Sequence, residues 1–207
     1  VFQPDWYRGV EYPKEQERGY ASTEDLYVPG YFEMPIKKGE SIVFSAAVSS
    51  IKPSVLKKLF DEEVAERNPR DNFFHCLVNA AHQFHIRKKN DDRYLLAGYP
   101  WFKCRARDTF ISLPGLTLSI EEQDYFELVM KTAEKGLREF MAGKPLTVQI
   151  AEIEQPDVLL WAIWAIQQYA KEAGLEKCRD MYGQLVKDIV KFIESDKHNN
   201  LQLRDNG

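Results

Sequence analysis

A single carboxylate, Asp108, follows a stretch of chain that is rich in aromatic and cationic side chains. An apolar run over residues 109–113 comes directly after it, so we expect a helix to begin here, with its free backbone N–H groups stabilising the negative charge. Aromatic faces in the stretch offer platforms on which a sugar or another planar group can stack. The alternative is that Asp108 is an ordinary helix cap and that the aromatic rings belong to the core. The aromatic residues are Tyr99, Trp101 and Phe102, and the cations are Lys103, Arg105 and Arg107.

A second carboxylate, Asp157, occupies a similar place later in the chain. It follows a connection over residues 144–155, and connections of about a dozen residues in compact domains are often functional. Pro156 before it is typical of a helix start, and Trp161 follows one turn later. We expect Asp157 either to line a binding site or to serve as a simple helix cap. We expect Trp164 to lie in the core.

Three segments around Asp108 resemble a known family. Residues 97–102, 107–111 and 113–116 resemble the signature of the glycogen debranching enzymes, in the amylo-alpha-1,6-glucosidase type of catalytic domain. In that pattern A-G-[YLF]-P-[WH]-F is followed, after a short gap, by W-G-R-D-T-[FM]-I-[AS]-L-P-G-L. Residues 105–106, an Arg and an Ala, stand where the family typically has Trp and Gly. The resemblance is tight over 97–118 and loose elsewhere. Residues 155–161 are similar to the family segment A-D-A-[ST]-L-W.

The resemblance implies hydrolysis of α-1,6-linked glucose at the branch points of glycogen or another branched α-glucan, with inversion. Inverting glycosidases use two carboxyl groups roughly 6.5–9.5 Å apart, one as general acid and one as general base. By resemblance, Asp108 is the general acid and Asp157 lines the sugar pocket. The other residues assigned to the substrate are Tyr99, Trp101, Phe102, Arg105, Arg107 and Trp161. No segment resembles the partner carboxylate, so we expect this chain alone to carry half a site and to be inactive.

The hydrophobic pattern predicts a mainly α fold from about residue 51 onward. The resemblance implies that residues 51–207 form the amino-terminal half of the glucosidase domain, a partial (α/α)6 toroid of helical hairpins. Residues 158–166 are apolar nearly all round, so that helix must be buried. The helices are expected over residues 54–67, 69–89, 108–118, 120–142, 157–166 and 175–196, with Gly143 ending the fourth.

Residues 1–50 have a different character, with recurring Pro, Gly and Tyr and a β-rich run over residues 41–48. We expect one or two strands there, which are too few to fold alone. The segment is either the tail of an upstream β-sandwich domain, as the resemblance implies, or an arm packed on the helices.

Composition excludes several classes of protein. A formal charge of −4 provides no basic surface for nucleic acid, and no apolar run approaches the length that spans a membrane. The amino end lacks the pattern of a signal peptide, and three widely spaced cysteines fit a reducing, cytoplasmic compartment better than a disulfide framework. His82 and His85 lie three residues apart on the predicted helix, with no acidic or Cys partner on the same face beyond Cys76, so we expect surface or core-edge histidines and no metal site. No cofactor is indicated.

Two other functions are compatible with the sequence. A helical module that binds glucan without cleaving it is slightly favoured by the Arg105-Ala106 departure. A scaffold without a ligand is the third possibility, but it does not explain an aromatic and cationic stretch before a carboxylate. In each case, helix faces that half a toroid leaves uncovered would promote self-association.

Overall fold

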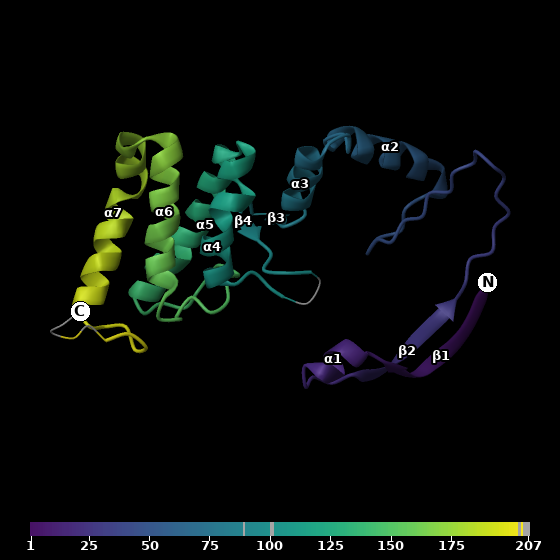
Figure 1. The fold of residues 1–207 in the computed structure, drawn as a ribbon, viewed down its shortest axis with the longest axis horizontal. Helices are drawn as coiled ribbons and strands as arrows, with labels where there is room; N and C mark the ends of the chain where they lie inside the picture. Colours follow the sequence, from purple (N-terminus) through teal and green to yellow (C-terminus); the bar gives the residue numbers. More distant parts are fainter. Residues whose placement is uncertain (89, 100–101, 203, 205–207) are drawn as a thin grey trace. The chain divides into compact units, whose positions relative to one another are not determined.

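The computed structural model describes residues 1–88, 90–99, 102–202 and 204. Trp101, one of the predicted substrate residues, lies outside this set. The chain divides into two compact units, Val1–Ala65 and Glu66–Gly207. Within the described residues the protein is mainly helical, with short antiparallel strands at its amino end (Figure 1). No described helix combines the length and apolar character that crossing a bilayer requires.

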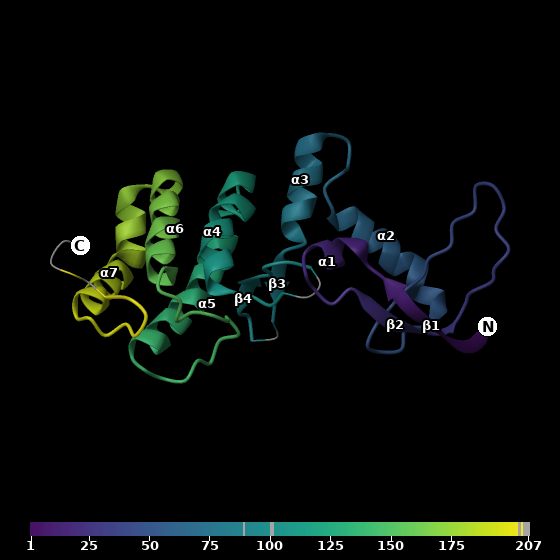
Figure 2. The ribbon, with the colours of Figure 1, turned by 60° about the horizontal axis from the view of Figure 1, so that its bottom comes forward.

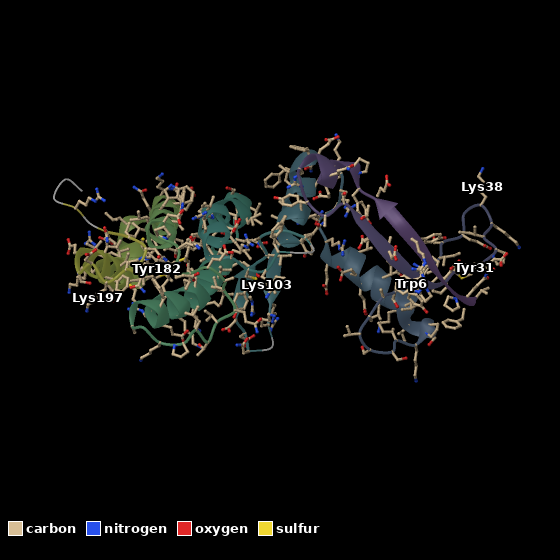
Figure 3. The ribbon with its side chains drawn as sticks, turned by 90° about the horizontal axis from the view of Figure 1, so that it is seen from below. Trp6, Tyr31, Lys38, Lys103, Tyr182 and Lys197 are labelled. Carbon is tan, nitrogen blue, oxygen red and sulfur yellow. The ribbon has the colours of Figure 1, made fainter. Side chains whose placement is uncertain are left out.

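The first unit is built on a β-hairpin. Strand β1 (Phe2–Glu11) pairs antiparallel with β2 (Thr23–Gly30), and the short helix α1 (Pro13–Glu17) lies in the connection. Trp6 of β1, labelled in Figure 3, lies directly opposite Tyr27 of β2, and the centroids of their rings are 5.3 Å apart. No residue of either strand is fully buried, so the hairpin depends on its backbone ladder and cross-strand pairs.

The prediction of a strand over residues 41–48 is wrong, because this segment is irregular. Its β-branched and apolar residues have no neighbouring strand with which to pair, whereas residues 2–11 and 23–30 are joined by a connection that folds them together. A 3-10 turn, η1 (Pro53–Val55), and helix α2 (Leu56–Glu66) follow, close to the predicted helix over 54–67.

The second unit is a layer of helices. It contains α3 (Phe73–His82), β3 (His85–Arg87), β4 (Arg93–Leu95), α4 (Ala106–Leu116), η2 (Leu118–Ile120), α5 (Gln123–Met141), α6 (Val158–Ala173) and α7 (Leu175–Glu194). Figures 1 and 2 both show α6 lying between α4 and α7. Helices α4 and α6 begin at the same end of the layer, since Arg107 in the first turn of α4 bonds Asp157 at the start of α6.

The helix predicted over 69–89 is shorter than expected. It begins after Asn72, whose side chain accepts a 2.8 Å hydrogen bond from the His75 N–H, and it ends at His82. The chain then forms an antiparallel hairpin in which His85 pairs with Leu95. The helical pattern continues past His82 in the sequence, but pairing with residues 93–95 satisfies the backbone there instead.

The core of this unit lies between α4, α5, α6 and α7. Phe126 stacks on Tyr169 with centroids 4.9 Å apart, and Tyr169 meets Tyr182 edge to face at 5.4 Å. Tyr182, labelled on α7 in Figure 3, is nearly fully buried, and burial raises the pKa of its hydroxyl. Other fully buried side chains are Phe110, Leu113, Met130, Leu137, Leu159, Leu185 and Ile189.

Several packing predictions need correction. On α7, Leu185 and Ile189 are buried as expected, but Met181 and Val190 are about two-fifths exposed. Helix α6 is not buried on all sides, because Leu160 faces solvent. Trp164 is half-buried and lies at the edge of the core.

The end of α5 confirms the predicted stop at Gly143. This residue has a φ of +64°, a left-handed conformation that glycine adopts without strain. The N–H groups of Gly143 and Lys144 donate to the carbonyls of Phe140 and Glu139, respectively. This is the Schellman pattern, which satisfies the last carbonyls of the helix and turns the chain into the connection towards α6.

Gly136 provides a test of how tightly that connection packs on α5. A Cβ at this position would lie 2.6 Å from Val148 Cγ2 and 3.1 Å from Ile153 Cδ1. We expect Gly136→Ala to lower the free energy of unfolding by about 1–3 kcal/mol, because overpacking exceeds the helix preference of alanine. Urea unfolding monitored by circular dichroism measures this change.

Gly115→Ala is the matched control, since Gly115 also lies in a helix but a Cβ there meets nothing within 4 Å. We expect it to leave stability unchanged or to raise it by up to about 1 kcal/mol. Equal effects of the two substitutions would contradict the close packing of Val148 on α5.

Candidate functional site

Two chain segments run side by side where α4 begins. Residues 104–106 pair with Ala151 in a parallel bridge: the Ala106 N–H donates to the Ala151 carbonyl at 2.9 Å, and the Ala151 N–H donates to the Cys104 carbonyl at 2.8 Å. Figure 1 shows the connection between α5 and α6 at the end of the layer where α4 starts. The bridge therefore holds the beginnings of α4 and α6 next to each other, and with them the two predicted carboxylates.

Arg107 and Asp157 form the main polar contact of this end. The guanidinium bonds both carboxylate oxygens, Nη2 to Oδ1 and Nε to Oδ2, each at 2.8 Å. Trp161 Nε1 donates to the same Oδ2 at 3.1 Å. These hydrogen bonds, chiefly those from Arg107, hold the pKa of Asp157 below its usual value, and Asp157 in turn raises the pKa of Arg107. Asp157 is therefore an ionised, fixed acceptor.

The structure tests one of the two alternatives for Asp157, the helix cap. It stands at the N-cap of α6, but its side chain makes no capping hydrogen bond because its oxygens are directed to Arg107 and Trp161. The simple cap is therefore wrong. Its predicted contact with a sugar stays a prediction.

Asp108 is not the N-cap of α4, so the alternative that it is an ordinary helix cap is wrong. Arg105 is the N-cap of α4, and Asp108 lies in the first helical turn, with its side chain exposed. No described residue donates a hydrogen bond to its carboxylate. The position lies beside the free N–H groups of the helix start, which favour negative charge, and leaves both oxygens available to a ligand.

Two aromatic residues before α4, Tyr99 and Phe102, lie outside the core. Tyr99 and Phe102 are 56% and 49% exposed, so the core alternative is wrong for both. Tyr99 packs edge to face on Phe84 at 5.9 Å, and its hydroxyl donates to the Gln83 carbonyl. Phe102 lies under the Arg105 guanidinium, 5.2 Å from the ring centroid.

Arg105 also pairs with Glu152, at 3.5 Å, a residue that the sequence did not single out. Glu152 adopts a left-handed conformation, with a φ of +60°, on the long connection. The acidic character of that connection was visible in the sequence, but its partner could not be identified because the two residues are far apart in the chain.

The site thus contains two groups of contacts. Arg107, Asp157 and Trp161 join α4 to α6, and Phe102, Arg105 and Glu152 join the segment before α4 to the connection. Tyr99 packs instead on Phe84 and bonds the Gln83 carbonyl, and Trp101 lies outside the described residues. A basic fork, an indole and free carboxylate oxygens suit a ligand with many hydroxyl groups.

The pairing of Arg107 with Asp157 predicts a pH-dependent contribution to stability. Folding lowers the pKa of Asp157, so the contribution is present above the unfolded value of 3.8 and is lost as the pH falls through the folded value. We expect Arg107→Gln to be less stable than wild type at pH 7, with the difference shrinking below pH 3.8. Urea midpoints measured in steps from pH 7 downward check this.

Arg107→Lys is the matched control, because it keeps the charge and loses the two-pronged geometry; we expect an intermediate stability at pH 7. A stability difference between wild type and Arg107→Gln that is the same at every pH would show that the ion pair does not cause it.

Two family models match this chain. The model described as "Glycogen debranching enzyme N terminal" matches residues 1–43, and the model described as "Amylo-alpha-1,6-glucosidase" matches residues 79–204. The second match contains Asp108, Asp157 and every residue of the two groups of contacts in the site. Neither the curated proteins nor the solved structures gave a match.

The family is an α-1,6-glucosidase of glycogen debranching, which implies a glycogen-type glucan substrate and a partial (α/α)6 fold. The resemblance seen in the sequence is thereby confirmed, and the chain belongs to the amylo-alpha-1,6-glucosidase family of glycogen debranching enzymes.

Proposed function

We propose that Asp108 is the general acid that protonates the glycosidic oxygen of an α-1,6-linked glucose at a glucan branch point. One observation carries the proposal. Arg107, the residue next to Asp108, directs its hydrogen bonds to Asp157 and not to Asp108. A cation bonded to a carboxylate favours its charged form, which opposes the work of an acid. Of the two predicted carboxylates, Asp108 is the one that escapes such a bond.

The surrounding residues supply substrate contacts in this proposal. Asp157 accepts hydrogen bonds from sugar hydroxyls or positions Arg107 and Trp161 to contact them. The exposed rings of Tyr99 and Phe102 offer faces on which a sugar can stack. Arg105 donates to sugar hydroxyls beside Phe102. Trp101 keeps its predicted stacking role.

We further propose an inverting mechanism in which the second carboxylate lies outside the segments that this chain contributes. Residues 51–207 then form the amino-terminal half of an (α/α)6 toroid, and residues 1–50 the end of an upstream β-sandwich and the junction. The chain alone releases no glucose, and its uncovered helix faces promote self-association. Three free cysteines among the described residues fit work in a reducing, cytoplasmic compartment.

The test uses a longer chain that carries this sequence together with the partner carboxylate. Free glucose released from a phosphorylase-trimmed branched dextrin is measured for wild type and for Asp108→Asn. We expect kcat to fall by about 10²-fold or more, because asparagine cannot deliver the proton.

Asp124→Asn is the matched control: Asp124 is also an exposed aspartate in the first turn of a helix, α5, and the charge change is the same. We expect it to keep the wild-type rate. Equal losses in the two variants, or an active Asp108→Asn, would contradict the role of Asp108.

A non-catalytic glucan-binding module remains the second candidate. The observation that favours it is that Arg105, in place of the Trp of the family, is held between the Phe102 ring and Glu152. If the longer chain binds dextrin in affinity electrophoresis but releases no glucose from it, the protein is a glucan-binding module and the glucosidase proposal is excluded.

A further inference from the structure

Three side chains that could hold a metal ion meet at the end of α4 opposite to Asp108. They are His82 at the end of α3, His85 at the start of β3 and Glu122 at the N-cap of α5, and their ligand atoms all lie within 4.8 Å of one another. His85 contacts the last residue of α4, Leu116, which is about 12 Å along the helix from Asp108. The cluster is therefore separate from the sugar site.

The tautomer of His85 follows from its hydrogen bond. Its Nε2 lies 2.9 Å from the Leu116 carbonyl, which can only accept, so Nε2 carries the proton. The ring is packed flat on Tyr125, with centroids 3.9 Å apart, and only 10% of the side chain is exposed. In the neutral imidazole that a metal ion requires, Nδ1 is then the nitrogen that bears the lone pair.

That lone pair faces a carboxylate oxygen. His85 Nδ1 lies 3.7 Å from Glu122 Oε2, and when the ring is neutral both atoms are acceptors. Such an approach is favourable only when a cation or a proton lies between the two atoms. The other oxygen, Oε1, lies 2.5 Å from His82 Nε2, so the carboxylate is held between two imidazoles.

The donor set and its support match those of transition-metal sites. Imidazole nitrogens together with a carboxylate suit zinc and neighbouring divalent metals. A ligating histidine usually donates its other N–H to a carbonyl or carboxylate, as His85 does to Leu116. Two ligand atoms about 2.1 Å from a tetrahedral zinc lie about 3.4 Å apart, close to the 3.7 Å between His85 and Glu122.

We propose that His82 Nε2, His85 Nδ1 and the Glu122 carboxylate bind one divalent transition-metal ion of the zinc type. For the ion to bind, Nε2 of His82 gives its proton to solvent and Nδ1 carries the ring proton, so that the neutral ring presents its Nε2 lone pair to the ion. His82 must move away from Glu122 by about 1 Å to reach tetrahedral spacing. It has room to do so, because its side chain is 39% exposed at the end of its helix. The bound ion ties α3, β3 and α5 together, and a fourth position stays open to water.

The test is zinc binding to the untagged 207-residue chain after treatment with a chelator. Isothermal titration with Zn²⁺ is expected to give one ion per chain, and Co²⁺ is expected to give the visible absorption of a tetrahedral site. Zn²⁺ is also expected to raise the Tm. His82→Gln and Glu122→Gln are expected to weaken binding by at least about tenfold and to abolish the Tm shift. Both side chains are a third or more exposed, and circular dichroism verifies that the variants fold.

His75→Gln is the matched control. His75 on α3 pairs through Nδ1 with Oδ1 of Asp71, which lies just before the helix, at 2.6 Å; this reproduces a histidine–carboxylate pair without a second histidine. We expect its zinc binding and Tm shift to equal those of wild type. Absence of stoichiometric binding to the wild-type chain, wild-type binding by either ligand variant, or an equal loss in His75→Gln would overturn the proposal.

Discussion

The two-pronged bond between Arg107 and Asp157 is the interaction on which the candidate site depends. It joins the first turn of α4 to the N-cap of α6, and so connects residues that are fifty positions apart. Because the fork of arginine matches both oxygens of a carboxylate, the bond determines orientation as well as distance. It also assigns the cation to one carboxylate and leaves the other, Asp108, with free oxygens.

That bond forms because the core brings the two helix starts to the same place. Val148, Ile150 and Ile153 of the long connection are buried, and the connection fits against α5 where Gly136 provides space. The connection then pairs with residues 104–106 through Ala151. Ala106 is fully buried, so a small residue lies where these backbones meet. The apolar packing therefore determines the spacing of the polar groups above it.

Helix α4 links two regions with different chemistry. Its amino end carries the exposed Asp108 and the fork of Arg107, where free N–H groups favour anions. At its carboxyl end, the Leu116 carbonyl fixes the tautomer of His85. The same helix thus places a candidate acid at one end and a pair of histidines with a carboxylate at the other. Backbone polarity, which is opposite at the two ends, accounts for this difference.

Much of this protein could be predicted from its sequence because the signals are local. The motif around Asp108, the helical periods of residues 120–142 and 175–196, and the stop at Gly143 depend on residues close together in the chain. Such signals determined the family and the mainly helical fold, and they singled out Asp108 as the candidate acid.

Tertiary structure decided the features that depend on distant partners. Residues 2–11, and not 41–48, form a strand because they have a partner, and α3 ends at His82 because residues 85–87 pair with residues 93–95. Arg107 could have bonded to Asp108 or to Asp157, and the fold selects Asp157. His82 and His85 have Glu122 as their acidic neighbour because the fold places the start of α5 beside them. The physical reason is that ion pairs and ligand sets require positions in space, which the chain acquires only when its core packs.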